Sequence, residues 1–95
     1  MQHLVSLLKE GNTVIFRPKG NSMSPKIKSG QQVQLEPPIC SELKEGDIVL
    51  CKVKGNLYLH LIKAIGNEEY LIGNNKGHIN GWTRQIYGVV TKIYA

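Results

Sequence analysis

The sequence predicts an all-β fold with one short helix at its N-terminus. Short apolar segments, several with alternating polar and apolar residues, recur along the chain, and clusters of Gly, Pro and Asn separate them. A helical spacing of apolar side chains occurs only at the start. A chain of 95 residues can build one core. We therefore expect a single domain over residues 1–95, with residues 1–11 as a helical cap and residues 12–95 as the β-domain.

The first predicted element is the helix in residues 1–11. Leu4, Leu7 and Leu8 share one face of such a helix, and Gly11 can end it. The segment lacks the basic start and long apolar centre of a signal peptide. No apolar run in the chain is long enough to span a bilayer. These features predict a cytoplasmic location.

About six short strands are predicted after the helix. They cover residues 13–18, 31–35, 47–53, 57–65, 70–73 and 85–94. In residues 57–65 the odd-numbered leucines share one face, and Tyr58, His60 and Ile62 share the other. Residues 54–56 form a tight connection. Residues 74–82, rich in Asn and Gly, are predicted to be a long polar loop that contains His78 and Trp82. This loop is a candidate specificity or partner surface, or Trp82 simply anchors it.

Composition argues against several classes of function. Cys40 and Cys51 form no Cys-x-x-Cys motif, and a cytoplasmic protein keeps them reduced. The three histidines fit no metal-ligand spacing. The net charge of +5 favours weak attraction to anions, but the lysines are spread along the chain. We expect no metal, no cofactor and no specific nucleic-acid partner.

The segment RPKGNSMSPKIKSGQ, residues 17–31, places Ser22 in a turn between Gly20 and Pro25. Such a turn exposes its serine on a constrained backbone. Most turn serines bond to the local backbone, whereas a nucleophilic serine needs a base within hydrogen-bond reach. The candidate bases are a desolvated lysine or one of the histidines, which are His3, His60 and His78.

Four segments together resemble a known family. GNSMSPKIKSGQQVQL resembles the Gly-x-Ser-Met-x-Pro box of the S24/S26 serine peptidases, which include signal peptidases and the self-cleaving LexA-type repressors. LKEGDIVLCKVKGNLYLHLIKAI resembles the family's Gly-Asp-Ile-Val-Val strand, its hairpin and the strand that carries the general base. YLIGNN resembles its Gly-Asp-Asn block, and IYGVVTKI its closing Gly-x-Val strand. The boxes follow the family's order from Phe16 to Ile93.

This resemblance implies a coiled, mostly antiparallel β-fold with Ser22 as nucleophile. His60 falls where bacterial signal peptidases and the repressors have lysine, and where the signal peptidases of archaea and the endoplasmic reticulum have histidine. The chain therefore resembles a minimal, soluble Ser-His variant of bacterial or phage type. Lys63 is an odd number of residues from His60, so the two point to opposite faces of a regular strand.

The resemblance also implies supporting roles around Ser22. The Ser22 N–H would begin an oxyanion hole, and Gly20 stands where some family members add a serine hydroxyl. Met23 would pack beneath the turn and line the pocket, and Pro25 would fix the exit of the turn.

The chain departs from the family pattern near the base. Asn74 replaces the acidic residue of the Gly-Asp-Asn block, and Leu61 replaces the usual arginine after the base. Asp47, the only aspartate, is expected to make backbone contacts in its own turn. We expect the side-chain oxygen of Asn74 or Asn75 to orient His60, as asparagine does in Cys-His-Asn sites.

Three functions are consistent with this sequence. The first is an endopeptidase that binds an extended peptide or protein substrate by strand addition beside residues 13–18. The second is a weak or inactive peptide-binding module of the same fold, and the third is a nucleic-acid-associated regulator. Neither Ala-Gly nor Cys-Gly occurs, so self-cleavage of the repressor type is not expected. The oligomeric state is left open.

Overall fold

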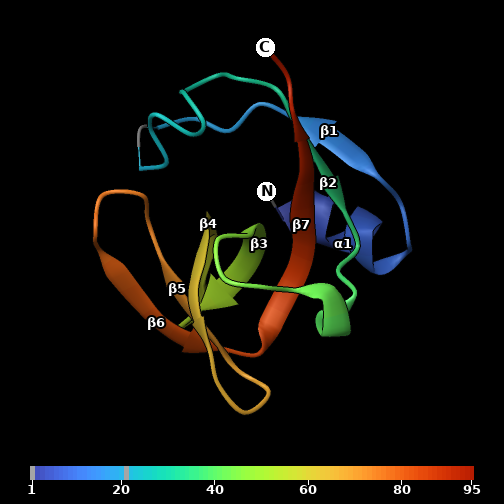
Figure 1. The fold of residues 1–95 in the computed structure, drawn as a ribbon. Coiled ribbons are helices and arrows are strands. Elements are labelled where there is room, and N and C mark those ends of the chain that lie inside the picture. The colour runs from blue at the N-terminus through green and yellow to red at the C-terminus, as the bar shows by residue number, and fades with distance from the viewer. Residues whose placement is uncertain (1, 21) are drawn as a thin grey trace.

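The computed structural model describes residues 2–20 and 22–95. Within these two ranges it has one α-helix, one 3-10 helix and seven strands (Figure 1). The elements in chain order are α1 (Gln2–Lys9), β1 (Val14–Phe16), β2 (Val33–Glu36), η1 (Cys40–Glu42), β3 (Ile48–Val53), β4 (Asn56–Ile65), β5 (Tyr70–Gly73), β6 (Ile79–Thr83) and β7 (Gln85–Ile93). The predicted all-β class with one short N-terminal helix is confirmed.

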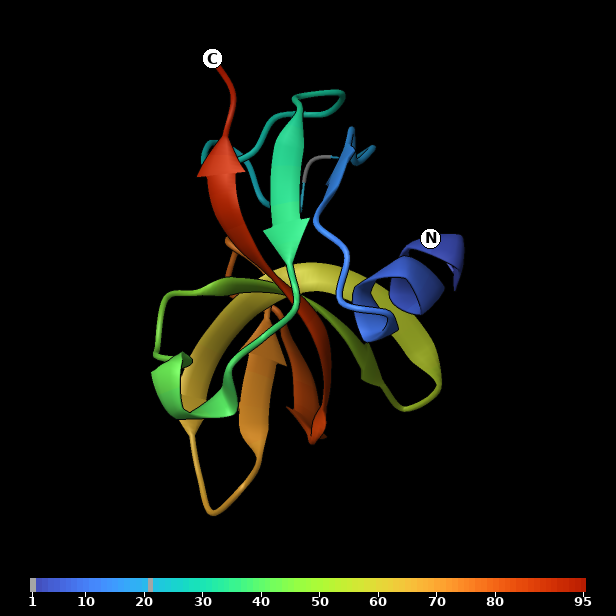
Figure 2. The same ribbon diagram turned by 90° about the vertical axis from the view of Figure 1, so that its right-hand side faces the viewer.

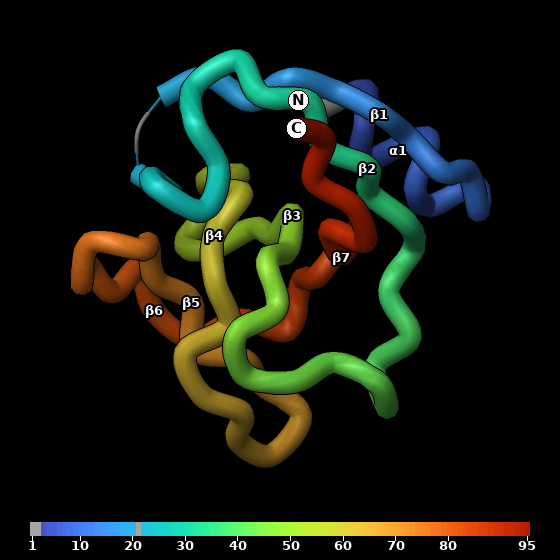
Figure 3. Tube along the Cα trace, turned by 45° about the horizontal axis from the view of Figure 1, so that its top comes forward, coloured from blue at the N-terminus to red at the C-terminus, as the bar shows by residue number. Residues whose placement is uncertain are grey.

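The strands form one sheet in the order β1-β2-β7-β3-β4-β5-β6, and all neighbours are antiparallel. β1 and β6 are therefore the edge strands. The sheet curls back on itself. The Thr83 hydroxyl at the end of β6 accordingly reaches the Lys52 carbonyl in β3, three strands away, and donates a hydrogen bond to it. The coiled path of the chain is visible in the tube view (Figure 3).

The β3–β4 hairpin is the centre of the sheet. Its turn consists of Lys54 and Gly55, with φ of 51° and 85°, which is the positive-φ pair that matches the twist of a two-residue hairpin. Side chains from both of its faces are buried in two apolar clusters. Leu50 and Leu59 belong to the cluster that includes α1, and Val49 and Ile62 belong to the other. The predicted alternation in β4 agrees with this division.

The helix packs against the β1–β2–β7 part of the sheet (Figures 1 and 2). Leu4, Val5 and Leu8 are buried, whereas Leu7, which we expected on the same face, is 39% exposed. Leu7 points outward because the buried face of this helix is formed by positions i, i+1 and i+4, which are Leu4, Val5 and Leu8. Gly88 in β7 permits the contact, because a Cβ at this position would lie 2.8 Å from Leu8 Cδ1.

The predicted loop over residues 74–82 is partly wrong. Residues Ile79–Thr83 form β6, which pairs with β5 as an edge strand. Asn and Gly suggested a loop, but pairing with β5 satisfies the backbone groups that such a loop would leave open. Trp82 is 48% exposed on β6, and its ring packs over Gly66, whose Cβ would lie 3.1 Å from the ring. Trp82 thus anchors β6 against the β4–β5 turn.

The cysteines are both free, Cys40 exposed and Cys51 buried. Burial raises the pKa of the Cys51 thiol to about 12, so this thiol is inert in the folded protein. No cluster of three or more His, Cys, Asp or Glu side chains suited to a metal ion occurs in residues 2–20 and 22–95. Within the same ranges, no helix has the length and apolar character to cross a bilayer.

Candidate active site

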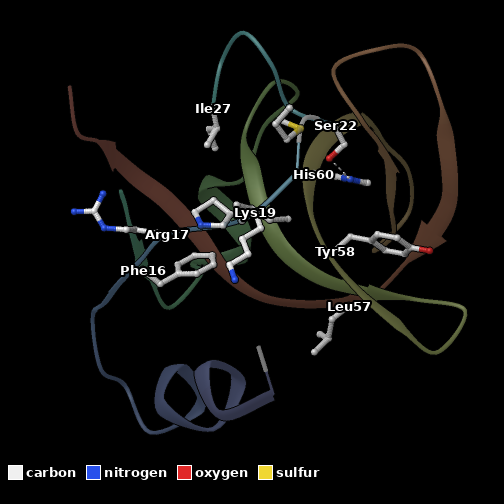
Figure 4. A pocket seen from close by; sticks show the side chains of 12 residues that line it. Phe16, Arg17, Lys19, Ser22, Ile27, Leu57, Tyr58 and His60 are labelled. Carbon is white, nitrogen blue, oxygen red and sulfur yellow. Dashed lines mark hydrogen bonds between the residues drawn. The ribbon is translucent and has the colours of Figure 1, made fainter. Parts of the chain in front are cut away.

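Ser22 and His60 lie together although 38 positions separate them in the sequence. Ser22 begins the turn that follows β1, and His60 lies on β4 opposite Val49 of β3. The Ser22 Oγ atom is 3.1 Å from His60 Nε2, and the two side chains point toward each other (Figure 4). Ser22 is exposed, whereas His60 is only 8% exposed. This is the arrangement of a nucleophile beside its base.

The second ring nitrogen of His60 faces Asn80, a residue that sequence analysis did not single out. His60 Nδ1 lies 2.7 Å from Asn80 Oδ1. Asn80 is the extra residue of a β-bulge, because Ile72 pairs with Gly81 while the next residue of β5 pairs with Ile79. A bulge re-aims the side chain that it inserts. β5 pairs with β4 only from Leu61 onward, so it does not separate β6 from His60.

The bond to Asn80 defines the tautomer of His60. Because the amide oxygen is the acceptor, Nδ1 carries the proton and Nε2 accepts from the Ser22 hydroxyl. The pKa of His60 is lowered from 6.5, first by burial and also by the charge of nearby His78, while the bond to Asn80 opposes the shift. The imidazole is therefore neutral at neutral pH and able to take a proton.

The expectation that Asn74 or Asn75 orients His60 is wrong, because both side chains bond elsewhere. The Asn74 side-chain oxygen accepts bonds from the N–H groups of Lys76 and His78, at 2.8 Å and 3.0 Å, and so closes the β5–β6 turn. Asn75 instead joins this turn to the serine turn. Its backbone N–H donates to the Ser22 carbonyl at 3.0 Å, and its Nδ2 donates to the Ser24 carbonyl at 2.9 Å. The β5–β6 hairpin thus contacts both Ser22, through Asn75, and His60, through Asn80.

Gly73 allows this hairpin to close. A Cβ at Gly73 would lie 2.6 Å from the His78 carbonyl oxygen. That carbonyl accepts the Asn74 N–H at 2.9 Å, so the two backbone segments must approach closely. The glycine of the GNN segment is needed for space, because its φ is not in the left-handed region.

The serine turn is held from inside and at its base. Met23 and Ile27 are buried in the apolar cluster beneath it, and the Ile27 N–H donates to the Met23 carbonyl at 3.0 Å. Arg17 donates to the Gly30 carbonyl at 3.0 Å, which ties together the two ends of the segment. Pro25 is exposed and follows a cis peptide bond.

Gly20 does not offer a free second donor for an oxyanion. Its N–H donates to the Ser29 hydroxyl at 3.1 Å, within the same segment. The Gly20 N–H is therefore already bonded to a side-chain oxygen of the protein. The assignment of an oxyanion donor to the Ser22 N–H rests on the family resemblance and stays a prediction.

A pocket of about 430 Å³ opens beside the Ser22–His60 pair. One wall comes from the end of β1 and the serine turn, and the other from β4 (Figure 4). It is lined by Phe16, Arg17, Pro18, Lys19, Gly20, Ser22, Met23, Ile27, Leu57, Tyr58, Leu59 and His60. The Tyr58 ring stacks on the His60 imidazole with centroids 5.0 Å apart and planes 22° from parallel.

The other candidate bases are not part of this pair. His3 lies exposed on α1, and His78 lies exposed in the β5–β6 turn. Lys63 lies beyond His60 at a bulge in β4, between Ile62 and Ala64. Among the hydrogen bonds of the described residues, His60 alone of these reaches Ser22.

A comparison with protein families defines the class of protein. The model of the Peptidase S24-like family matches residues 2–89 of the chain, so the protein belongs to this family. Neither the curated proteins nor the solved structures gave a significant match. Membership confirms the family resemblance predicted from the sequence.

Proposed function

We propose that the protein is a serine endopeptidase that uses Ser22 as nucleophile and His60 as general base. The observation that carries this proposal is the 3.1 Å contact between Ser22 Oγ and His60 Nε2. A base at this distance, in the tautomer that accepts a proton at Nε2, is the requirement for activating a serine. Membership of the Peptidase S24-like family supports a protein or peptide substrate.

In the first half of the reaction, His60 Nε2 takes the Ser22 proton as Oγ bonds to the scissile carbonyl carbon. The Ser22 N–H stabilises the negative charge on the carbonyl oxygen. His60 then gives the proton to the leaving amine, the C–N bond breaks, and an acyl-enzyme is left. In the second half, His60 Nε2 removes a proton from water as the water oxygen bonds to the ester carbon. His60 then returns this proton to Ser22 Oγ as the ester C–O bond breaks, which releases a carboxylic acid and restores Ser22 and neutral His60.

The pocket suggests how a substrate is held. β1 is an edge strand, and the Leu57–His60 half of β4 lacks a β5 partner. Backbone groups on both walls of the pocket are therefore able to pair with an extended peptide, as in recognition by strand addition. This placement would bring a scissile carbonyl alongside Ser22.

A non-catalytic peptide-binding module is the second candidate, and two observations favour it. The partner of His60 is an uncharged amide, which orients the ring but stabilises the imidazolium less than a carboxylate does. The Gly20 N–H is already bonded to Ser29. Removing one oxyanion donor typically costs about 3 kcal/mol of transition-state stabilisation.

The deciding experiment compares wild type with Ser22→Ala, His60→Ala and a control, Ser24→Ala, which removes another hydroxyl from the same turn. Each protein is incubated with a mixed peptide library, and products are identified by mass spectrometry. We expect Ser22→Ala and His60→Ala to lose about a thousandfold or more of the cleavage rate, and Ser24→Ala to retain it. A fluorophosphonate probe gives a second readout, because it should label Ser22 and not the Ser22→Ala protein. If wild type shows neither cleavage nor labelling, the peptidase proposal is refuted and the non-catalytic peptide-binding module is supported.

A further inference from the structure

We propose that the peptide recognised in this pocket is acidic, with one of its carboxylates paired to Lys19 and a neighbouring apolar side chain seated among the pocket's apolar residues. This proposal rests on the proposed function, in which an extended peptide binds in the pocket beside Ser22 and His60. It adds the chemical class of the bound segment.

Both walls of the pocket come from stretches of chain that contain cations and no carboxylate. Residues 11–35 contain four Lys or Arg residues and no Asp or Glu. Residues 48–67 contain three lysines and again no Asp or Glu. The seven Asp and Glu residues of the chain lie elsewhere, at Glu10, within residues 36–47 and at residues 68–69. The lining of the pocket contains Arg17 and Lys19 and no Asp or Glu, which favours negative charge on the ligand.

Lys19 is the cation best placed to bind such a charge. It is exposed and lines the pocket, between Phe16 and Ser22 in the chain (Figure 4). No hydrogen bond or salt bridge of its ammonium occurs within residues 2–20 and 22–95. Arg17, the other cation of the lining, already donates to the Gly30 carbonyl. A ligand carboxylate would therefore not compete with an acid of the described chain for Lys19.

The rest of the lining calls for an apolar side chain beside that carboxylate. Phe16, Met23, Ile27, Leu57 and Leu59 contribute apolar surface to the pocket. Its volume of about 430 Å³ lies within the range of about 300–1,000 Å³ found for pockets that enclose ligands. Burying an apolar side chain there supplies affinity, and the ion pair at the exposed rim supplies selectivity.

A peptide fits these features better than a nucleic acid. A nucleic acid is bound through several phosphates at once, along a stripe of cations. Here the lining offers the Lys19 ammonium beside an apolar floor and a strand edge with open backbone groups. Those backbone groups match the amides of an extended peptide.

The test measures binding to the Ser22→Ala protein, so that cleavage does not interfere. The probes are fluorescent extended peptides that contain one Leu, with Glu moved through each neighbouring position, and matched peptides with Gln or Lys at the same position. At low salt we expect the best Glu peptide to bind about threefold to fivefold more tightly than its Gln partner. The Lys peptide should bind more weakly than both, and the difference should shrink in about 0.5 M salt.

Lys19→Glu in the same background should reverse the order, so that the Lys peptide binds best. Lys92→Glu is the matched control, because it makes the same charge change on exposed β7 outside the pocket. It should keep the preference for Glu. The inference is overturned if Glu, Gln and Lys peptides bind equally, or if Lys19→Glu behaves as Lys92→Glu does. It is also overturned if a single-stranded oligonucleotide displaces the Glu peptide with higher affinity than the unlabelled peptide.

Wild-type protein separates this inference from the proposed function. Peptides that bind with the expected charge preference but remain intact would refute the peptidase proposal and support the acidic ligand. Cleavage with equal kcat/KM for Glu and Lys peptides would support the peptidase and refute the acidic ligand.

Discussion

Asn80 Oδ1 accepts a 2.7 Å hydrogen bond from His60 Nδ1, while Nε2 of the same ring faces Ser22 at 3.1 Å. The three side chains form a Ser-His-Asn relay, with an amide where a carboxylate stands in Ser-His-Asp sites. An amide holds the tautomer but adds no negative charge. In the proposed reaction, the imidazolium would therefore depend on orientation more than on a counter-charge.

Asn80→Ala should lower kcat/KM about 10-fold to 100-fold, because Nδ1–H loses its partner and the ring loses its orientation. Asn67→Ala, in the exposed β4–β5 turn, is the control and should leave kcat/KM unchanged. Steady-state kinetics on a peptide identified in the library experiment measures both. Equal activity of Asn80→Ala and wild type would refute the positioning role of Asn80.

Asn80→Asp should raise the pKa of His60 by about one unit or more, because a carboxylate beside Nδ1 stabilises the imidazolium. The same charge should raise kcat at about pH 8, where the base is still neutral. NMR titration of the imidazole carbons reports the pKa directly. A pKa equal to that of wild type would show that the introduced carboxylate does not face His60.

The dependence of activity on pH follows from the lowered pKa of His60. Burial disfavours the imidazolium, so the pKa lies below 6.5 in the folded protein. Only the neutral ring accepts the Ser22 proton, so kcat/KM should rise with pH through a midpoint below 6.5 and then level off. An ascending midpoint above 6.5, in a protein whose fold is unchanged by circular dichroism, would contradict the assignment of His60 as base.

The lowered pKa of His60 also makes the stability of the fold depend on pH. The unfolded chain binds a proton at His60 near pH 6.5, whereas the folded protein resists doing so until a lower pH. Protons therefore favour unfolding in this window, and this contribution to stability is present above about pH 6.5 and lost as the pH falls. His60→Gln should remove it, which urea denaturation at about pH 7 and about pH 5.5 measures. A pH dependence that is identical in the two proteins would contradict the shift.

Tyr58→Leu should lower kcat/KM about threefold to tenfold, because the stacked ring that orients His60 is lost. Tyr58→Phe keeps the ring and should retain the activity. NMR titration of His60 separates a local effect from loss of fold, since the titrating signal should move in Tyr58→Leu and remain in place in Tyr58→Phe. Equal kinetics for the two variants would show that stacking has no role.

Gly73→Ala should destabilise the protein by about 1–3 kcal/mol and reduce activity, because the new Cβ meets the His78 carbonyl. Gly66→Ala is the comparison, since the atoms nearest to its Cβ belong to the half-exposed Trp82 side chain and not to backbone. Urea denaturation should therefore show a smaller loss for Gly66→Ala. Equal losses for the two variants would argue against close backbone approach as the role of Gly73.

Several features of the fold could be predicted because they depend on local pattern. Alternation in residues 57–65 divided β4 correctly between two apolar clusters, and the helix at the start was placed correctly. The strand at residues 79–83 could not be predicted in this way. Its Asn and Gly residues favour loops locally, and pairing with β5 overrides that preference.

The candidate site also has a part that could be predicted from the sequence and a part that could not. Ser22 and His60 were named from segments whose order resembled the family, and the family match over residues 2–89 confirms that resemblance. The partner of His60 was expected at Asn74 or Asn75, because those residues align with the family's acidic block. The sequence alone therefore determined the fold class, the family and the two candidate reactive residues, Ser22 and His60. Only the tertiary structure decided which residue orients His60, because a one-residue bulge in β6 turns Asn80 toward His60, and strand periodicity carries no signal for where a bulge occurs.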